Sequence, residues 1–229
     1  MITVAAQPYY KTVACSEILA RVAQASRRSL PGLMATFLLN YKLMRKPFEA
    51  AFKTRDFRHA PMAISPDEGE FLYQITRARK ASLVVEFGTS FGVSAIYLAS
   101  ALRDQGSGRF IGTEIEADKV EQARRNLAAA GLDDVAEVRA GDARETLGSI
   151  AESIDILFLD GWKNLYLPIL TLLLPRMAPG SILLADNMNM FKHDLAPFVE
   201  FVKDPARGRF LTSTLPIGDG LEFAIRLDG

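Results

Sequence analysis

From residue 82 to residue 186, the chain alternates between short apolar segments and longer amphipathic ones. Each apolar segment is long enough for one strand, and together they predict strands at 82–87, 109–114, 135–140, 154–160 and 181–186. The helical spacing of apolar residues predicts helices at 93–102, 117–130, 142–150 and 166–177. Strands that are apolar on both faces and separated by helices are typical of a parallel sheet covered on both sides. We therefore expect a doubly wound α/β fold.

The end of the chain has a different pattern. Residues 209–216 and 221–227 flank a Gly-Asp-Gly turn, which predicts an antiparallel hairpin at the edge of the sheet. Other residues mark helix boundaries. Ser65 followed by Pro66 is typical of a helix start, and Pro175 is expected to kink or end the helix that contains it.

The first 60 residues differ from the rest in charge. The chain as a whole has 27 basic and 27 acidic residues, but residues 1–60 contain ten basic and only three acidic ones. After a break expected at Leu30-Pro31-Gly32, one helical stripe is apolar and consists of Leu33, Phe37, Tyr41 and Met44. We divide the chain into a basic helical extension (1–60), expected to act as a lid or dimerisation element, and a main domain (61–229). An apolar stripe needs a partner, which is the main domain or a second subunit, with a membrane surface as the alternative. For the oligomeric state we predict a homodimer.

Composition excludes several classes of protein. A balanced net charge argues against a nucleic-acid partner held by bulk positive charge. Cys15 is the single cysteine, so no intramolecular disulfide or cysteine-rich zinc site can form, and a reducing cytoplasm is the expected compartment. We expect no secretion signal, because the first residues lack a basic start followed by an apolar core. No apolar stretch approaches the roughly 20 residues of a membrane span.

Ligands of doubly wound sheets bind where the parallel strands end, so the residues at these ends are candidates for a site. Glu86 lies near the end of the first strand, and Gly88 and Gly92 predict a tight turn after it. The fingerprint G-x-G-x-x-G is absent, which counts against a bound dinucleotide. Glu114 ends the second strand, where a carboxylate is suited to bind both hydroxyls of a ribose. Asp142 follows the third strand and either caps the next helix or meets an adenine amino group, two roles that are compatible.

The ends of the fourth and fifth strands carry the most specific pattern. Asp160 follows the fourth strand, and Asp186 and Asn187 follow the fifth. Two carboxylates and an amide are hard oxygen donors that suit Mg²⁺, with the remaining positions left to substrate or water. The alternative is that each acid caps a helix. Lys163 would lie beside the ion, whose charge would favour the neutral amine and let it act as a base.

Three separated motifs resemble one known family. LDGWKNLYLP, LLADN and DGLEFAI occur in the order found in metal-dependent class I S-adenosylmethionine-dependent O-methyltransferases, the family of catechol and caffeoyl-CoA O-methyltransferases. The resemblance covers residues 83–227, roughly two thirds of the chain, and implies a Rossmann-like methyltransferase sheet. One departure is Gly161, because the catechol enzymes have a histidine there against the adenine, so adenine binding must rely on other walls.

The resemblance also implies a role for each matching residue. Asp160, Asp186 and Asn187 would bind Mg²⁺ or another divalent cation. Lys163 would be the general base, and Glu222 would hold the second hydroxyl of the substrate. The residues implied around S-adenosylmethionine are Met62, Glu86, Gly88, Ser94, Glu114, Ile115, Asp142, Asp160 and Trp162.

The motifs together predict a Mg²⁺-dependent enzyme that methylates one hydroxyl of a catechol-like small molecule. A natural product or a coenzyme A thioester is an alternative acceptor with suitable oxygens. An NAD-dependent oxidoreductase on a similar sheet and a non-catalytic binding protein are the rival classes. Binding of NAD without S-adenosylmethionine would favour the first rival, and cofactor binding without turnover would favour the second.

Overall fold

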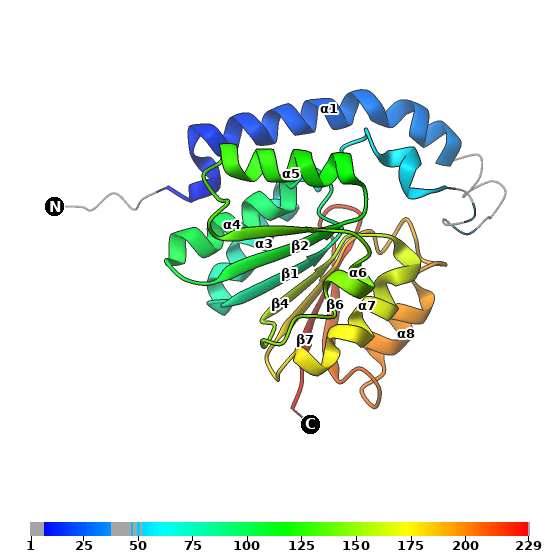
Figure 1. The fold of residues 1–229 in the computed structure, drawn as a ribbon. Coiled ribbons are helices and arrows are strands. Elements are labelled where there is room, and N and C mark those ends of the chain that lie inside the picture. The colour runs from blue at the N-terminus through cyan, green and yellow to red at the C-terminus, as the bar shows by residue number, and fades with distance from the viewer. Residues whose placement is uncertain (1–6, 38–46, 48–49, 51, 229) are drawn as a thin grey trace.

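The chain forms one seven-stranded sheet with helices on both faces (Figure 1), in a computed structural model that describes residues 7–37, 47, 50 and 52–228. The strand order is β3-β2-β1-β4-β5-β7-β6. The strands are β1 (Leu83–Phe87), β2 (Arg109–Glu114), β3 (Ala136–Ala140), β4 (Ile156–Leu159), β5 (Ile182–Ala185), β6 (Phe210–Leu215) and β7 (Leu221–Arg226). The pairings among β1 to β5 are parallel, and β7 is antiparallel to both β5 and β6. The predicted mostly parallel sheet with an antiparallel C-terminal hairpin is confirmed.

Helices cover the two faces in two groups. The described helices are α1 (Val13–Phe37), α3 (Pro66–Arg79), α4 (Val93–Gln105), α5 (Ala117–Ala129), α6 (Ala143–Thr146), α7 (Tyr166–Leu173) and α8 (Ala196–Lys203). Short 3₁₀ turns are η1 (Tyr9–Lys11), η3 (Thr54–Phe57), η4 (Lys163–Leu165) and η5 (Leu174–Arg176). One core cluster joins α1, α3, α4 and α5 to the sheet, and the other joins α6, α7 and α8 to it. Neighbouring residues Val84 and Val85 of β1 belong to different clusters, because successive strand side chains point to opposite faces.

Local signals explain several helix boundaries. The Ser65 hydroxyl accepts a hydrogen bond of 3.2 Å from the Glu68 N–H, and Pro66 occupies the first helical position, so α3 begins as predicted. Helix α7 ends at Leu173, and Pro175 lies in the 3₁₀ turn that follows. The sequence did not predict α8, although this helix packs in the same core as α7.

The expected break at Leu30-Pro31-Gly32 is wrong, because α1 continues through these three residues to Phe37. A proline inside a helix removes one backbone hydrogen bond, and here that loss does not end the helix. Earlier in α1, Cys15, Ile18 and Val22 are buried in the cluster that contains α4 and α5. Part of the apolar and basic pattern expected after the break lies outside the described residues, namely Tyr41, Lys42, Met44, Arg45 and Lys46. Within the part that is described, no helix is both long and apolar enough to cross a membrane.

Candidate active site

A cavity of about 240 Å³ lies at the carboxyl ends of the parallel strands. Its walls come from the segments that follow β1, β2, β3, β4 and β5, and from residues 54–62 before α3. This is the edge of the sheet at which ligands of doubly wound folds bind. Most of the predicted site residues line it: Met62, Gly88, Glu114, Ile115, Asp142, Asp160, Trp162, Lys163 and Asn187.

Asp160 and Asp186 are placed side by side by the pairing of β4 with β5. The register pairs Leu159 with Ala185, so each aspartate follows directly after a paired strand residue. Their N–H groups also continue the ladders, since Asp160 donates to the Phe87 carbonyl at 2.9 Å and Asp186 donates to the Leu159 carbonyl at 3.0 Å. Burial and the neighbouring Asp186 charge raise the pKa of Asp160 well above its ordinary value. Burial also raises the pKa of Asp186. A cation between these two carboxylates would favour their charged forms and so lower both pKa values.

The donor set fits a divalent cation when an amide is counted with the carboxylates. Within the described residues, no three His, Cys, Asp or Glu side chains are grouped to hold a metal ion. A site here therefore needs Asn187 as its third donor, together with Asp160 and Asp186. Asn187 has a left-handed backbone with φ of 65°, and its N–H donates to Asp186 Oδ1 at 2.5 Å. Two carboxylates and one amide are the hard oxygen donors that Mg²⁺ prefers.

Lys163 is held beside this cluster in a buried position. Its Nζ lies 3.6 Å from Asp160 Oδ1, and its side chain is 7% exposed. The same Nζ donates a hydrogen bond of 2.8 Å to the Tyr166 hydroxyl, which donates in turn to the Asp186 carbonyl at 3.2 Å. The lysine also lies over the Phe191 ring, 5.4 Å from its centre. These contacts fix the amine at the cavity wall, between Asp160 and the segment that carries Asp186.

Glu86 and Ser94 lie behind the cavity wall and are not among the residues that line it. Glu86 is fully buried, and neither of its carboxylate oxygens has a hydrogen-bond partner. Burial raises its pKa to about 7, against the opposing effect of the nearby Ser94 and Thr89 hydroxyls. An unpartnered buried carboxylate fits a ligand that brings a positively charged group to it.

Gly88 brings two loops into close contact. It has a φ of 100°, and a Cβ there would lie 2.5 Å from the Gly161 Cα and 2.6 Å from the Asp160 carbonyl oxygen. The segments after β1 and β4 can therefore pack this closely only because residue 88 has no side chain. A Cβ on Gly161 would in turn lie 2.5 Å from the ring of Phe87. Phe87 thus fills the space next to Gly161.

Glu114 and Asp142 occupy the wall formed by β2 and β3. Glu114 Oε2 accepts from the Ser90 N–H at 2.9 Å, and Oε1 accepts from the Ile115 N–H at 2.8 Å. Oε1 also accepts from the Glu116 N–H at 3.0 Å, which uses both of its lone pairs, so Oε2 is the oxygen that can still accept a further hydrogen bond. Asp142 caps α6 by accepting from the Arg144 N–H at 2.9 Å, and hydrogen bonds from Arg144 lower its pKa. The capping role proposed for Asp142 is confirmed, and its contact with adenine stays a prediction.

Glu222 lies beside the cluster but does not line the cavity. In the pairing of β5 with β7 it stands opposite Ala185, the residue before Asp186. It is 1% exposed, and its two carboxylate oxygens accept hydrogen bonds from the Thr212 and Thr214 hydroxyls of β6. Each oxygen keeps a second lone pair, and the role of Glu222 toward a substrate hydroxyl stays a prediction.

The sequence did not indicate that three further buried residues belong to the site. Tyr166 connects Lys163 to Asp186, and Lys119 on α5 lines the cavity while only 5% exposed. Glu68 is 1% exposed, and burial followed by the Asp186 and Asp160 charges raises its pKa to about 9. Tyr166 lies inside the LDGWKNLYLP motif, so a signal for it was present. Glu68 was interpreted only as an acid at the start of a helix.

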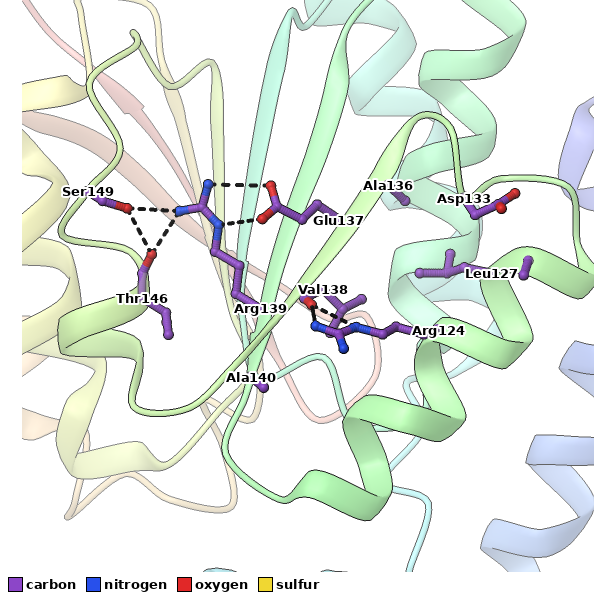
Figure 2. Close-up of a pocket in the computed structure, with 11 residues that line it drawn as sticks. Arg124, Leu127, Asp133, Ala136, Glu137, Val138, Arg139, Ala140, Thr146 and Ser149 are labelled. Atoms are coloured by element: carbon purple, nitrogen blue, oxygen red, sulfur yellow. Dashed lines mark hydrogen bonds and ion pairs between the residues drawn. The ribbon is translucent and has the colours of Figure 1, made fainter.

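A second hollow lies at the outer edge of the sheet, along β3 (Figure 2). Arg124 Nη2 donates to the Val138 carbonyl at 2.6 Å, and Arg139 Nε donates to Glu137 Oε1 at 2.9 Å. Arg139 also donates to the Thr146 carbonyl at 2.8 Å. Both arginines are thus used within the chain, and the predicted site residues lie elsewhere.

Comparison with known proteins identifies the family. A model described as a methyltransferase domain matches residues 85–188. The catechol O-methyltransferase of Niastella koreensis is 30% identical over 131 residues, which cover 56% of this chain and 58% of that enzyme. The catechol O-methyltransferase of Sus scrofa is 30% identical over 135 residues, which cover 56% of this chain and 71% of that enzyme. The chain belongs to the S-adenosylmethionine-dependent O-methyltransferases.

A solved structure shows the same fold over nearly the whole chain. The crystal structure of the O-methyltransferase TomG from Streptomyces achromogenes, in complex with S-adenosylmethionine, matches with a TM-score of 0.70 at 23% identity. The match covers 93% of this chain and 90% of that one. The predicted Rossmann-like methyltransferase sheet is thereby confirmed. The methyltransferase family was also predicted correctly from its three motifs.

Proposed function

We propose that this protein transfers the methyl group of S-adenosylmethionine to one hydroxyl of a catechol-like small molecule, in a reaction that depends on Mg²⁺ or another divalent cation. One observation carries the proposal. Lys163 lies 3.6 Å from Asp160 at the cavity wall, where the pairing of β4 with β5 also brings Asp186 next to Asp160, and Asn187 lines the cavity. A base and three hard oxygen donors at one ligand-binding edge are the parts that this reaction needs.

The cofactor would occupy the part of the cavity formed by the ends of β1, β2 and β3. Glu114 is suited to a ribose hydroxyl, because it lines the cavity and its Oε2 accepts one backbone hydrogen bond and retains a lone pair. Glu86, buried and unpartnered, is suited to the ammonium group of the methionine part. The other proposed contacts are Met62, Gly88, Ser94, Ile115, Asp142, Asp160 and Trp162.

When bound, S-adenosylmethionine supplies an electrophilic methyl group, and the divalent cation lowers the pKa of a phenolic hydroxyl, which is about 10 in water. Lys163 is the group placed to take the proton, at Nζ. Tyr166 fixes that nitrogen relative to the backbone of Asp186, so the base and the metal ligands keep one geometry. Alignment of the reacting groups is expected to be the main contribution of the protein. Glu222 is proposed to hold the second hydroxyl.

Acceptors of related chemistry are a natural product with vicinal hydroxyls and a coenzyme A thioester, and a substrate panel separates them.

The rival NAD-dependent oxidoreductase has one specific observation against it. The loop after β1 contains Gly88 and Gly92 but lacks the third glycine of the dinucleotide fingerprint.

The test is the transfer of a labelled methyl group from S-adenosylmethionine to a simple catechol. We expect transfer that a chelator abolishes and added Mg²⁺ restores, and a loss of roughly 10²–10⁴-fold in kcat for Lys163→Met. Lys203→Met removes an exposed lysine at the end of α8 and should leave kcat unchanged. Methylation that persists both in chelator and in Asp160→Ala would contradict the metal role. Cofactor binding without turnover on any diol would favour a non-catalytic protein.

A further inference from the structure

Glu68 is an acidic residue whose surroundings differ from those of an ordinary helix start. It is the third residue of α3, where a glutamate normally lies at the surface or accepts a hydrogen bond from the backbone N–H of the capping residue. Here the side chain is 1% exposed, and its Oε1 has no hydrogen-bond partner. Its neighbour Asp67, in the same helical turn, is exposed.

The buried carboxylate faces the proposed metal ligands. A Cβ placed on Gly218, in the turn between β6 and β7, would lie 2.7 Å from Glu68 Oε2 and 3.8 Å from Asp186 Oδ1. Both oxygens therefore lie beside the same point of this turn. The charges of Asp186 and Asp160 both raise the pKa of Glu68, and the Lys163 charge and the Ser65 N–H oppose them, so all of these groups lie within interaction range of this carboxylate. The helix cap does not require this position, because the Ser65 hydroxyl already receives the Glu68 N–H.

A buried carboxylate oxygen without a partner lowers the stability of the folded chain, so the retention of Glu68 with an unpartnered Oε1 calls for a ligand. Three donors from Asp160, Asp186 and Asn187 leave half of an octahedral coordination shell to substrate oxygens and water. The hydrogens of a metal-bound water need acceptors in a buried site. Carboxylates just outside the coordination shell commonly serve this purpose, and their loss weakens metal binding by about 10–100-fold.

We propose that Glu68 is an outer carboxylate of the divalent-cation site, which accepts a hydrogen bond from a water molecule on the ion. It is a positioning residue, because it acts on the ion through that water. The inference rests on the proposed function for the presence of the cation. It adds a residue from α3, an element that precedes β1 and contributes none of the predicted ligands.

The test measures the Kd for Mn²⁺ on the full chain. Electron paramagnetic resonance detects the free ion, and its signal falls as Mn²⁺ binds. The variants are Glu68→Gln, which keeps the shape of the side chain, and Asp67→Asn, which makes the same charge change at the exposed neighbour. We expect Glu68→Gln to raise the Kd for Mn²⁺ about 10–100-fold. Asp67→Asn should change the Kd less than about twofold, because exposed charges are screened by solvent.

Melting temperatures without metal separate this role from a structural one. If Glu68 serves the ion, Glu68→Gln melts no lower than the unaltered protein, because the change removes an unpaired buried acid. All titrations are run well below the lowest melting midpoint, so that every variant is folded. An unchanged Kd in Glu68→Gln, with or without a lower melting temperature, overturns the inference about Glu68 and leaves the metal-dependent function untouched. Absence of Mn²⁺ binding in the unaltered protein overturns it together with the metal-dependent function.

Discussion

Two buried acids without full hydrogen bonding, Glu68 and Glu86, both lie within electrostatic range of Asp160. Burial is the largest cause of the raised pKa of each acid, and each occupies a place where a cationic ligand is proposed. At the scale of the residue, the site is therefore built for charge that the chain itself does not supply. Such acids reduce stability in the absence of ligand, which makes them measurable without an activity assay.

For Glu86, the sign of the effect of pH on stability follows from its pKa of about 7, compared with an ordinary value of 4.5. Between these values the unfolded chain has lost the proton and the folded chain still holds it, so this group's contribution to stability falls as the pH rises. We expect Glu86→Gln to be more stable than the unaltered protein at pH 8 by roughly 3 kcal/mol, and by much less at pH 5. Urea denaturation of both proteins at the two pH values measures the difference. A difference that does not change with pH would contradict the prediction.

The pair of Gly161 and Phe87 gives a second prediction. Gly161→Ala should destabilise the fold by about 1–3 kcal/mol, because its Cβ would lie 2.5 Å from the Phe87 ring. In Phe87→Leu the smaller side chain leaves room for that Cβ, so the double variant should recover most of the loss. Chemical denaturation of the two single variants and the double variant gives the coupling between the residues. If the two effects simply add, Phe87 is not the reason for the glycine.

At the scale of the elements, the close approach of α3 to α4 positions Glu68. Gly69 follows Glu68, and a Cβ there would overlap the ring of Tyr97 on α4. Glycine is a poor helix former, and a Gly→Ala change in an open helix typically gains about 1 kcal/mol. Its presence in α3 is explained by the close contact between the two helices.

Gly69→Ala is therefore expected to lose stability, by about 1–3 kcal/mol, despite the better helix propensity of alanine. Tyr97→Leu shortens the opposing side chain and should make the alanine tolerable. Thermal and urea denaturation of the single and double variants checks both statements. Greater stability of Gly69→Ala than of the unaltered protein would show that propensity outweighs packing at this contact.

The sequence predicted the elements whose signals are local. Each of the seven strands overlaps its predicted segment, and β2 matches it at both ends. For β1, β4 and β5 the reason is that strands buried on both faces are apolar runs with clear limits. The acids at the strand ends were found for the same reason, since position after a parallel strand decides where they lie. Glu68 was missed because its role depends on Gly218 and Asp186, which are far away in sequence. The course of α1 through Pro31 was missed because proline was given too much weight as a helix end.

At the scale of the whole molecule, charge is divided between the first 60 residues and the rest. The acidic excess of the main domain includes the proposed ligand-binding acids Glu86, Glu114, Asp160, Asp186 and Glu222. The basic residues of the extension have no part in the proposed chemistry. Their expected use is to pack against another surface, as a lid or in a dimer.

We predict that the protein is a homodimer through this extension. Light scattering coupled to size-exclusion chromatography should give twice the monomer mass at working concentration. A variant that lacks residues 1–12 keeps α1 and should remain dimeric. A monomer mass for the full chain across the accessible concentration range would contradict the prediction.

The outer edge of the sheet limits how two copies can associate. Edge strands with free carbonyl groups can pair with a strand from another molecule. On β3, Arg124 donates through both Nε and Nη2 to the carbonyl of Val138, the middle residue of that strand. An incoming strand would have to displace a charged side chain that makes two hydrogen bonds. The guanidinium is therefore expected to block edge-to-edge pairing of β3 with a strand of a neighbouring molecule.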